Sequence, residues 1–241
     1  MAFDYKKEYK GLYMPKATPT IVEVPEMKFI AVNGSGNPNE PDGEYHQALG
    51  ILYPVAYALK MSYKTDYRID GFFEYVVPPL EGLWWTGNAV TDDFTDKSAF
   101  RWIAMIRVPD FVEEDDVEWA KREMTRKKGL DCSSLYHMSF EEGLCSQIMH
   151  TGSYDTESVS LDAIDGYIES NGYIKDITAS RRHHEIYLSD PRKCSPEKLK
   201  TVLVGKVPLS RCSVCFRSSS SCFFFPALRR LRHSACSRLF P

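Results

Sequence analysis

The sequence has no long apolar run, and this absence bounds where the protein works. None of its 241 residues belongs to an apolar stretch near the roughly 18 residues that a membrane-spanning helix needs. The opening residues, Met-Ala-Phe-Asp-Tyr-Lys-Lys, are not followed by an apolar signal region. We therefore expect a cytoplasmic protein that has no membrane partner.

Acidic residues are missing from the last part of the chain. Residues 205–241 contain seven Lys or Arg and no Asp or Glu, which leaves 23 basic and 33 acidic residues in residues 1–204. An acidic body argues against nucleic acid as its ligand. The serine run and the abrupt change in composition predict a disordered tail over residues 208–241, after a folded domain over residues 1–207.

A second cysteine pair, which a zinc knuckle would require, is also lacking. Cys212 and Cys215 form a single CxxC, and Cys222, His233 and Cys236 follow at spacings that do not make a second pair. A zinc site in the tail is the alternative, but we expect no metal site and no cofactor. The three cysteines of the body are scattered, as is typical of reduced thiols in a cytosolic protein.

The glycine-rich loop at residues 33–38 lacks the features of a phosphate-binding loop. It has no Lys-Ser/Thr ending and no third glycine, so nucleotide binding is not expected. Apolar residues then recur at helical spacing over residues 43–60, which indicates a helix with one buried face. Pro54 interrupts this pattern and predicts a kink near Gly50.

The order of the expected elements repeats along the chain. A strand, a glycine-containing loop, a helix and two strands occur in about residues 21–108 and again in about residues 144–207. We expect a strand pair or one long strand over residues 19–32. The other expected strands are residues 69–77, 101–108, 144–150, 183–188 and 201–207. This repetition predicts an α+β fold of two strand-helix-strand-strand units that form a joint antiparallel sheet, with a ligand groove between them.

Glu185 is the candidate functional residue of the second unit. Side chains alternate along a strand, so Glu185 should share one face with His183 and Tyr187, while Ile186 and Leu188 point to the other. A carboxylate is costly to bury without a partner, and it is usually kept where a cationic, polar or reactive group meets it. The alternative is a partly exposed strand on which Glu185 pairs with an arginine of residues 181–182.

Trp84 and Trp85 are adjacent on a segment that reads as extended. Adjacent side chains on a strand face opposite ways, so one indole can anchor in the core while the other presents a flat ring to a cavity. We favour Trp85 for the cavity. The alternative is that both tryptophans are structural.

The chain resembles the gyrase-inhibitor-like (GyrI-like) small-molecule-binding family. The resemblance rests on residues 83–87, 100–107, 109–112 and 184–188 and covers roughly residues 1–207. It implies two repeated units around an aromatic pocket with a central acid, a position that Glu185 matches. The absence of a helix-turn-helix before residue 20 argues against the form of the family that activates transcription.

The branch with the tryptophan pair is similar to cyclopropanoid cyclopropyl hydrolases, which open the strained ring of DNA-alkylating antibiotics and protect the cell. Two functions follow from the resemblance. In a hydrolase, Glu185 is the general base and a tyrosine hydroxyl donates to the developing oxyanion. In a non-catalytic binding module, an aromatic or cationic ligand meets Glu185, Trp84, Trp85, His183 and Tyr187. The oligomeric state is left open.

Overall fold

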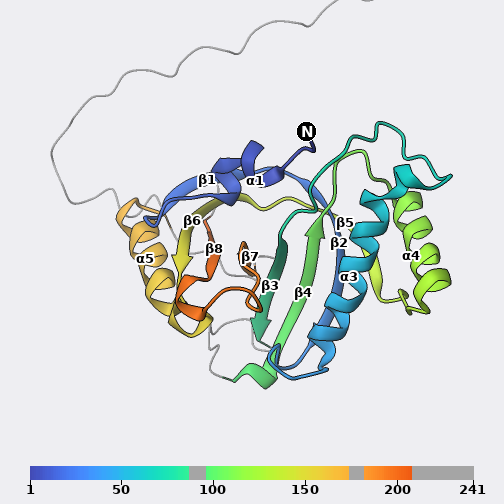
Figure 1. Cartoon of the computed structure of the whole chain (residues 1–241). Coiled ribbons are helices and arrows are strands. Elements are labelled where there is room, and N and C mark those ends of the chain that lie inside the picture. Colours follow the sequence, from blue (N-terminus) through green and yellow to red (C-terminus); the bar gives the residue numbers. More distant parts are fainter. Residues whose placement is uncertain (87–95, 174–181, 208–241) are drawn as a thin grey trace, which may run out of the picture.

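The computed structural model describes residues 1–86, 96–173 and 182–207 and has an α+β fold (Figure 1). The tail for which we predict disorder, residues 208–241, lies outside the described residues. Eight strands of the described part form one antiparallel sheet in the order β1-β6-β8-β7-β3-β4-β2-β5. The strands are β1 Thr20–Val24, β2 Met27–Ser35, β3 Leu80–Thr86, β4 Phe100–Arg107, β5 Leu135–Phe140, β6 Gly143–Thr151, β7 His183–Tyr187 and β8 Lys200–Lys206.

Three longer helices accompany the sheet: α3 Glu44–Lys60, α4 Glu114–Lys128 and α5 Glu157–Ser170. Two four-residue helices, α1 Tyr5–Glu8 and α2 Lys10–Tyr13, lie near the N-terminus. Short 3₁₀ turns complete the described elements, at Ser62–Lys64 (η1), Lys97–Ala99 (η2), Tyr154–Thr156 (η3) and Pro196–Lys198 (η4). In the described part of the chain, no helix combines the length and apolar character needed to cross a membrane.

The predicted repetition is confirmed by the sheet topology. The order β2-α3-β3-β4 in the first half recurs as β6-α5-β7-β8 in the second, and the halves join where β3 pairs with β7. The two edge strands are exchanged between the halves. The strand β1 precedes β2 but pairs with β6, and β5 precedes β6 but pairs with β2.

One row of cross-strand partners runs through six strands and fixes what lies on the helix-bearing face. Paired residues in neighbouring strands point to the same face of a sheet. The row is Ile148, Leu203, Glu185, Gly82, Ala104 and Val32. At one end of the row, Ile148 and Leu203 pack against α5. At the other end, Ala104 and Val32 belong to the core under α3. Glu185 and Gly82 belong to β7 and β3, the two middle strands of the sheet, which lie between α5 and α3 in Figure 1.

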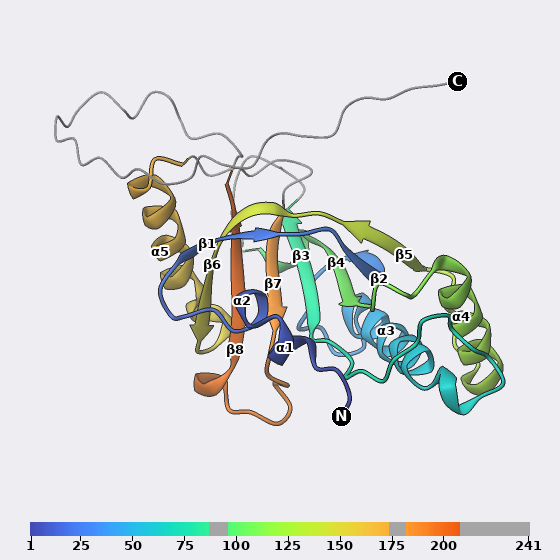
Figure 2. The same ribbon diagram turned by 90° about the horizontal axis from the view of Figure 1, so that it is seen from above.

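Each face of the sheet has its own core. The helix α3, with α4 outside it, packs on β2 and β4 through residues such as Leu52 and Leu59, both fully buried. The helix α5 closes a smaller cluster around Ile164 and Ile168. The opposite face is covered by N-terminal residues including Tyr5 and by the edge strands, which cross it at an angle in Figure 2.

The ends of α4 follow from local sequence. Glu113 and Asp116 form a reciprocal capping pair at its start. Acidic residues occupy the first turn and basic residues the last, which suits the helix dipole. Gly129 ends the helix with φ 66°, a left-handed conformation that glycine adopts without a steric penalty.

The expected strand over residues 69–77 is wrong. The structure places β3 later, and within residues 69–77 only Tyr75 makes a ladder contact, an isolated bridge to Phe3. Ile69 and Tyr75 are nevertheless buried. A packed irregular segment and a strand bury apolar residues alike, so composition does not separate them. The strand β5 was not predicted. The proline does lie inside α3, which continues as one helix through Pro54.

Candidate functional site

The carboxylate of Glu185 is held between two ring side chains of its own strand. His183 Nε2 and Glu185 Oε1 are hydrogen bonded at 3.0 Å, and the Tyr187 hydroxyl donates to Glu185 Oε2 at 2.6 Å. These three side chains share a face, as the alternation predicts. The side chain of Glu185 is 14% exposed, so it is largely, but not completely, removed from water.

The alternative partner of Glu185 is engaged elsewhere. The guanidinium of Arg182 lies over the ring of Trp85, 3.5 Å from its centroid, a cation–π contact. Trp85 packs with the core on the opposite face of the sheet. Arg181, the other candidate partner, lies outside the described residues.

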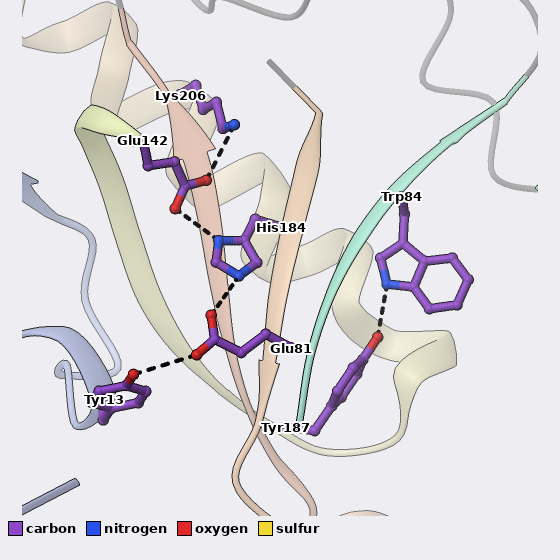
Figure 3. A network of polar contacts seen from close by, with 7 residues as sticks. All are labelled: Tyr13, Glu81, Trp84, Glu142, His184, Tyr187 and Lys206. Atoms are coloured by element: carbon purple, nitrogen blue, oxygen red, sulfur yellow. Dashed lines mark hydrogen bonds and ion pairs between the residues drawn. The ribbon is translucent and has the colours of Figure 1, made fainter. Parts of the chain in front are cut away.

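Trp84, rather than Trp85, shares the face of Glu185, which corrects the preference for Trp85. Gly82 pairs with Glu185 and Trp84 pairs with His183, so this register decides which indole accompanies the acid. Trp84 Nε1 donates to the Tyr187 hydroxyl at 2.8 Å (Figure 3). The indole is buried, with Tyr45 on one side and Phe100 on another. Trp84 therefore orients Tyr187, and Tyr187 orients Glu185.

Two further tyrosines, each near the start of a helix, complete the surroundings of Glu185. Tyr45 lies in the first turn of α3, and burial, followed by the charge of Glu185, raises the pKa of its hydroxyl. Tyr154 begins the η3 turn before α5 and meets the Tyr187 ring edge to face, with centroids 5.9 Å apart. Burial and then Glu157 raise the pKa of Tyr154 to about 12. These phenols therefore keep their protons at neutral pH.

A second carboxyl group, Glu157, lies near Glu185. It is the first residue of α5 and is 8% exposed. Burial, followed by the negative charge of Glu185, raises the pKa of Glu157 to about 9, although the Thr201 side chain acts in the opposite direction. The two acids therefore differ in environment: Glu185 accepts hydrogen bonds from side chains, and Glu157 is pushed towards its protonated form.

The opposite face of the same strands carries a buried network of charges (Figure 3). His184, the neighbour of Glu185, contacts Glu142 Oε2 through Nδ1 at 2.7 Å and Glu81 Oε2 through Nε2 at 3.0 Å. Lys206 Nζ lies 3.3 Å from Glu142 Oε1. The Tyr13 hydroxyl donates to Glu81 Oε1 at 3.4 Å.

This network connects the two halves of the sheet. Burial alone would lower the pKa of His184, but Glu142 and Glu81 more than offset it and raise the pKa to about 9. The same pairing, with help from Lys206, lowers the pKa of Glu142 in spite of its burial. An imidazolium between two carboxylates satisfies both ring nitrogens, so it holds β7 against β3 from beneath Glu185.

A cavity of about 390 Å³ lies between α3 and α4, away from these residues. Its lining includes Tyr57, Trp119 and Met124 and none of the site residues expected from the sequence. The acid at its rim, Glu123, is paired with Arg126 and Lys127. Within the described ranges, no group of three or more His, Cys, Asp or Glu side chains could hold a metal ion.

A scan against protein families matches residues 17–204 to the GyrI-like small molecule binding domain. The chain belongs to the GyrI-like family. A crystal structure of a hydrolase from Listeria innocua is similar, with 43% identity and a TM-score of 0.78 over 86% of this chain and all of that one. An uncharacterized conserved protein from Listeria innocua has 44% identity and a TM-score of 0.81 over the same shares. A search of curated proteins found no match.

Several residues around Glu185 in this GyrI-like domain were not predicted from the sequence. They are Gly82, Tyr45, Tyr154 and Glu157. A signal was present for the tyrosines, because each follows a glycine-containing loop at the start of the helix in its repeat. Gly82 and Glu157 carry no local signal, since their proximity to Glu185 depends on strand pairing and on the packing of α5.

Proposed function

We propose that the protein binds flat aromatic small molecules on the helix-bearing face of the sheet and hydrolyses a strained cyclopropane ring, with Glu185 as the general base. The observation that carries this proposal is the setting of Glu185, a mid-sheet carboxylate held by His183 and Tyr187 at 3.0 and 2.6 Å. Membership of a small-molecule-binding family and the similar hydrolase from Listeria innocua support it.

Opening of an activated cyclopropane ring requires few protein groups other than a positioned base. A cyclopropane conjugated with an acceptor group is already electrophilic, so a base that removes a proton from attacking water is the main requirement. Glu185 has the geometry for this role, because Tyr187 and His183 hold its two oxygens in fixed positions. Tyr154, which is 38% exposed and meets the Tyr187 ring edge to face, offers a stacking surface for an aromatic substrate. The buried rings of Trp84 and Tyr45 belong to the core around Tyr187.

Non-catalytic binding is the second candidate, and one observation favours it. Both oxygens of Glu185 already have partners on β7, so a water molecule must compete with them for the base. In this alternative, the acid serves as a counter-charge for a cationic ligand or as an acceptor for its hydrogen-bond donors, and the protein sequesters the compound.

The deciding experiment measures ring opening of an aromatic compound that bears a carbonyl-activated cyclopropane. Glu185→Gln conserves volume but removes basicity, so we expect the rate to fall by roughly 10²-fold or more while ligand affinity stays similar. Glu23→Gln, on the exposed side of β1, is the control and should hydrolyse like wild type. Full activity in Glu185→Gln would exclude Glu185 as the base. If wild type binds the compound without converting it, the hydrolase function is excluded and only non-catalytic binding remains.

A further inference from the structure

The hydroxyl of Tyr187 is already committed within the site. It donates its only proton to Glu185 and accepts the Nε1 proton of Trp84. While these bonds persist, Tyr187 has no proton to offer a ligand. A substrate oxygen that gains negative charge during ring opening therefore needs another donor.

Glu157 is placed to be that donor. Thr201 and Tyr187 are cross-strand partners, so both lie on the face of Glu185, and the Thr201 side chain interacts with the Glu157 carboxyl. Glu157 is 8% exposed. Its Oε1 atom has no hydrogen-bond partner among the residues of the described ranges. Buried polar atoms are nearly always paired, so an unpaired carboxyl oxygen beside a candidate site points to a ligand.

The charge state of Glu157 suits a donor. Its pKa is raised to about 9, by burial first and by Glu185 second. The position at the start of α5 acts the other way, because a helix N-terminus favours an anion, but this effect is worth at most about 1.5 pKa units for a buried group. At neutral pH the carboxyl therefore keeps its proton, and a protonated carboxyl has one O–H to donate.

We infer that Glu157 is the acid of the site and that it donates a hydrogen bond to a carbonyl oxygen of the ligand. This inference rests on the proposed function, and it narrows the ligand to a flat aromatic compound whose carbonyl group is conjugated with the reactive ring. A second carboxylate in place of a neutral acid would repel such an oxygen. Glu157, as the neutral acid, and Glu185, as the base that accepts hydrogen bonds, therefore divide the acid and base roles between two glutamates.

The ring-opening step balances with these two residues. Glu185 takes a proton from water, and the water oxygen bonds to a ring carbon. The ring C–C bond breaks, and its electron pair moves through the conjugated system to the carbonyl oxygen, which takes the proton of Glu157. The product carries a new alcohol and an enol or phenol. Proton transfer from Glu185 back to Glu157, through solvent, restores the starting state.

The test uses 9-fluorenone and fluorene, two flat tricyclic probes that differ in one carbonyl group and do not react. Dissociation constants are measured at pH 7 and near pH 10 for wild type, Glu157→Leu and Glu157→Gln. We expect wild type to prefer the ketone by about 3- to 10-fold at pH 7 and to lose this preference near pH 10. Glu157→Leu should show no preference at either pH.

Glu157→Gln separates a donor from a purely structural residue. Its amide N–H donates at every pH, so the ketone preference should persist near pH 10, where wild type has lost it. Other groups near Glu157 are Glu185 and Tyr187 on β7, Tyr154 and Asp155 on η3, and Thr201 on β8. The pKa of Tyr154 is about 12 and that of Tyr187 is higher than its usual value, so neither tyrosine titrates in this interval.

The outcomes are distinguishable. A ketone preference that survives in Glu157→Leu overturns the inference and leaves the proposed function standing, and so does a preference in Glu157→Gln that vanishes near pH 10. Failure of wild type to bind either probe overturns the proposed function itself. The exposed acid of the same helix, Glu169, supplies the control Glu169→Gln, which should behave as wild type. If Glu157→Leu does not fold, the infrared band of a protonated carboxylic acid decides: it should be present in wild type at pH 7 and absent in Glu157→Gln.

Discussion

Gly82 and Glu185 are cross-strand partners where β3 meets β7. The absence of a side chain at Gly82 leaves the space that the Trp84–Tyr187 hydrogen bond occupies. A Cβ atom on Gly82 would lie 2.5 Å from Trp84 Nε1 and 3.1 Å from the Tyr187 hydroxyl. The glycine therefore permits the chain of contacts that ends on the Glu185 carboxylate.

Gly82→Ala tests this relationship. The added methyl group should displace Trp84 and Tyr187, at a cost of about 1–3 kcal/mol in the free energy of unfolding, and should reduce ligand binding or turnover. The measurements are urea unfolding and ligand titration. Gly205→Ala is the matched control: its Cβ would meet Ile164 Cγ2 at 2.6 Å, under α5. It should lose stability but retain function, and normal binding by Gly82→Ala would contradict the assignment.

The two tryptophans should differ in their effect on ligand binding. Trp84→Phe keeps an aromatic ring but removes the donor that orients Tyr187, so affinity should fall by about 3- to 10-fold. Trp85→Ala alters the opposite face and the Arg182 contact, so affinity should stay near that of wild type. Calorimetric titration with one flat aromatic ligand compares them. A larger loss in Trp85→Ala would place the ligand on the other face.

The free energy of unfolding should fall as pH rises, because Glu157 and His184 each keep a proton in the folded protein that the unfolded chain loses. Glu157 has a folded pKa of about 9, against about 4.3 for an unperturbed Glu, so the native state keeps a proton that the unfolded state loses. His184, with a folded pKa of about 9, adds the same effect above about pH 6.5. Each group lowers the free energy of unfolding by at most about 1.4 kcal/mol per pH unit.

Urea unfolding across pH 4.5–9 checks this dependence. Below about pH 6.5 the stabilisation from His184 is fully present and no longer changes with pH. The slope of the free energy of unfolding that remains there is therefore assigned to Glu157. Glu157→Gln should therefore flatten the profile between about pH 4.5 and 6.5 and leave the His184 slope above it. An unchanged profile in the variant would show that Glu157 is ionised in the folded protein.

The last prediction concerns the boundary of the domain. We propose that residues 1–207 form the folded unit, because Val207 is the last described residue and is fully buried in the α5 cluster. Truncation after Val207 should change the melting temperature by only a few degrees. Differential scanning calorimetry of the truncated and full chains measures this, and a large drop would mean that residues 208–241 pack on the domain.

Local patterns in the sequence determined a large part of the fold. Alternation placed His183, Glu185 and Tyr187 on one face, because successive side chains of a strand must point opposite ways. The acids and bases of α4, closed by Gly129, set its limits through the helix dipole and a left-handed end. The repeated order of elements predicted a joint sheet, since each half has an apolar face that only the other elements can cover.

Tertiary structure alone decided which residues meet Glu185. The register of β3 against β7 brought Trp84 to its face instead of Trp85, and a shift of one residue would have reversed that choice. The packing of α5 brought Glu157 close, across 28 residues of chain. His184 meets Glu81 over a separation of 103 residues. Such contacts depend on which strands pair, and a period of two or 3.6 residues within one segment contains no information about its partners.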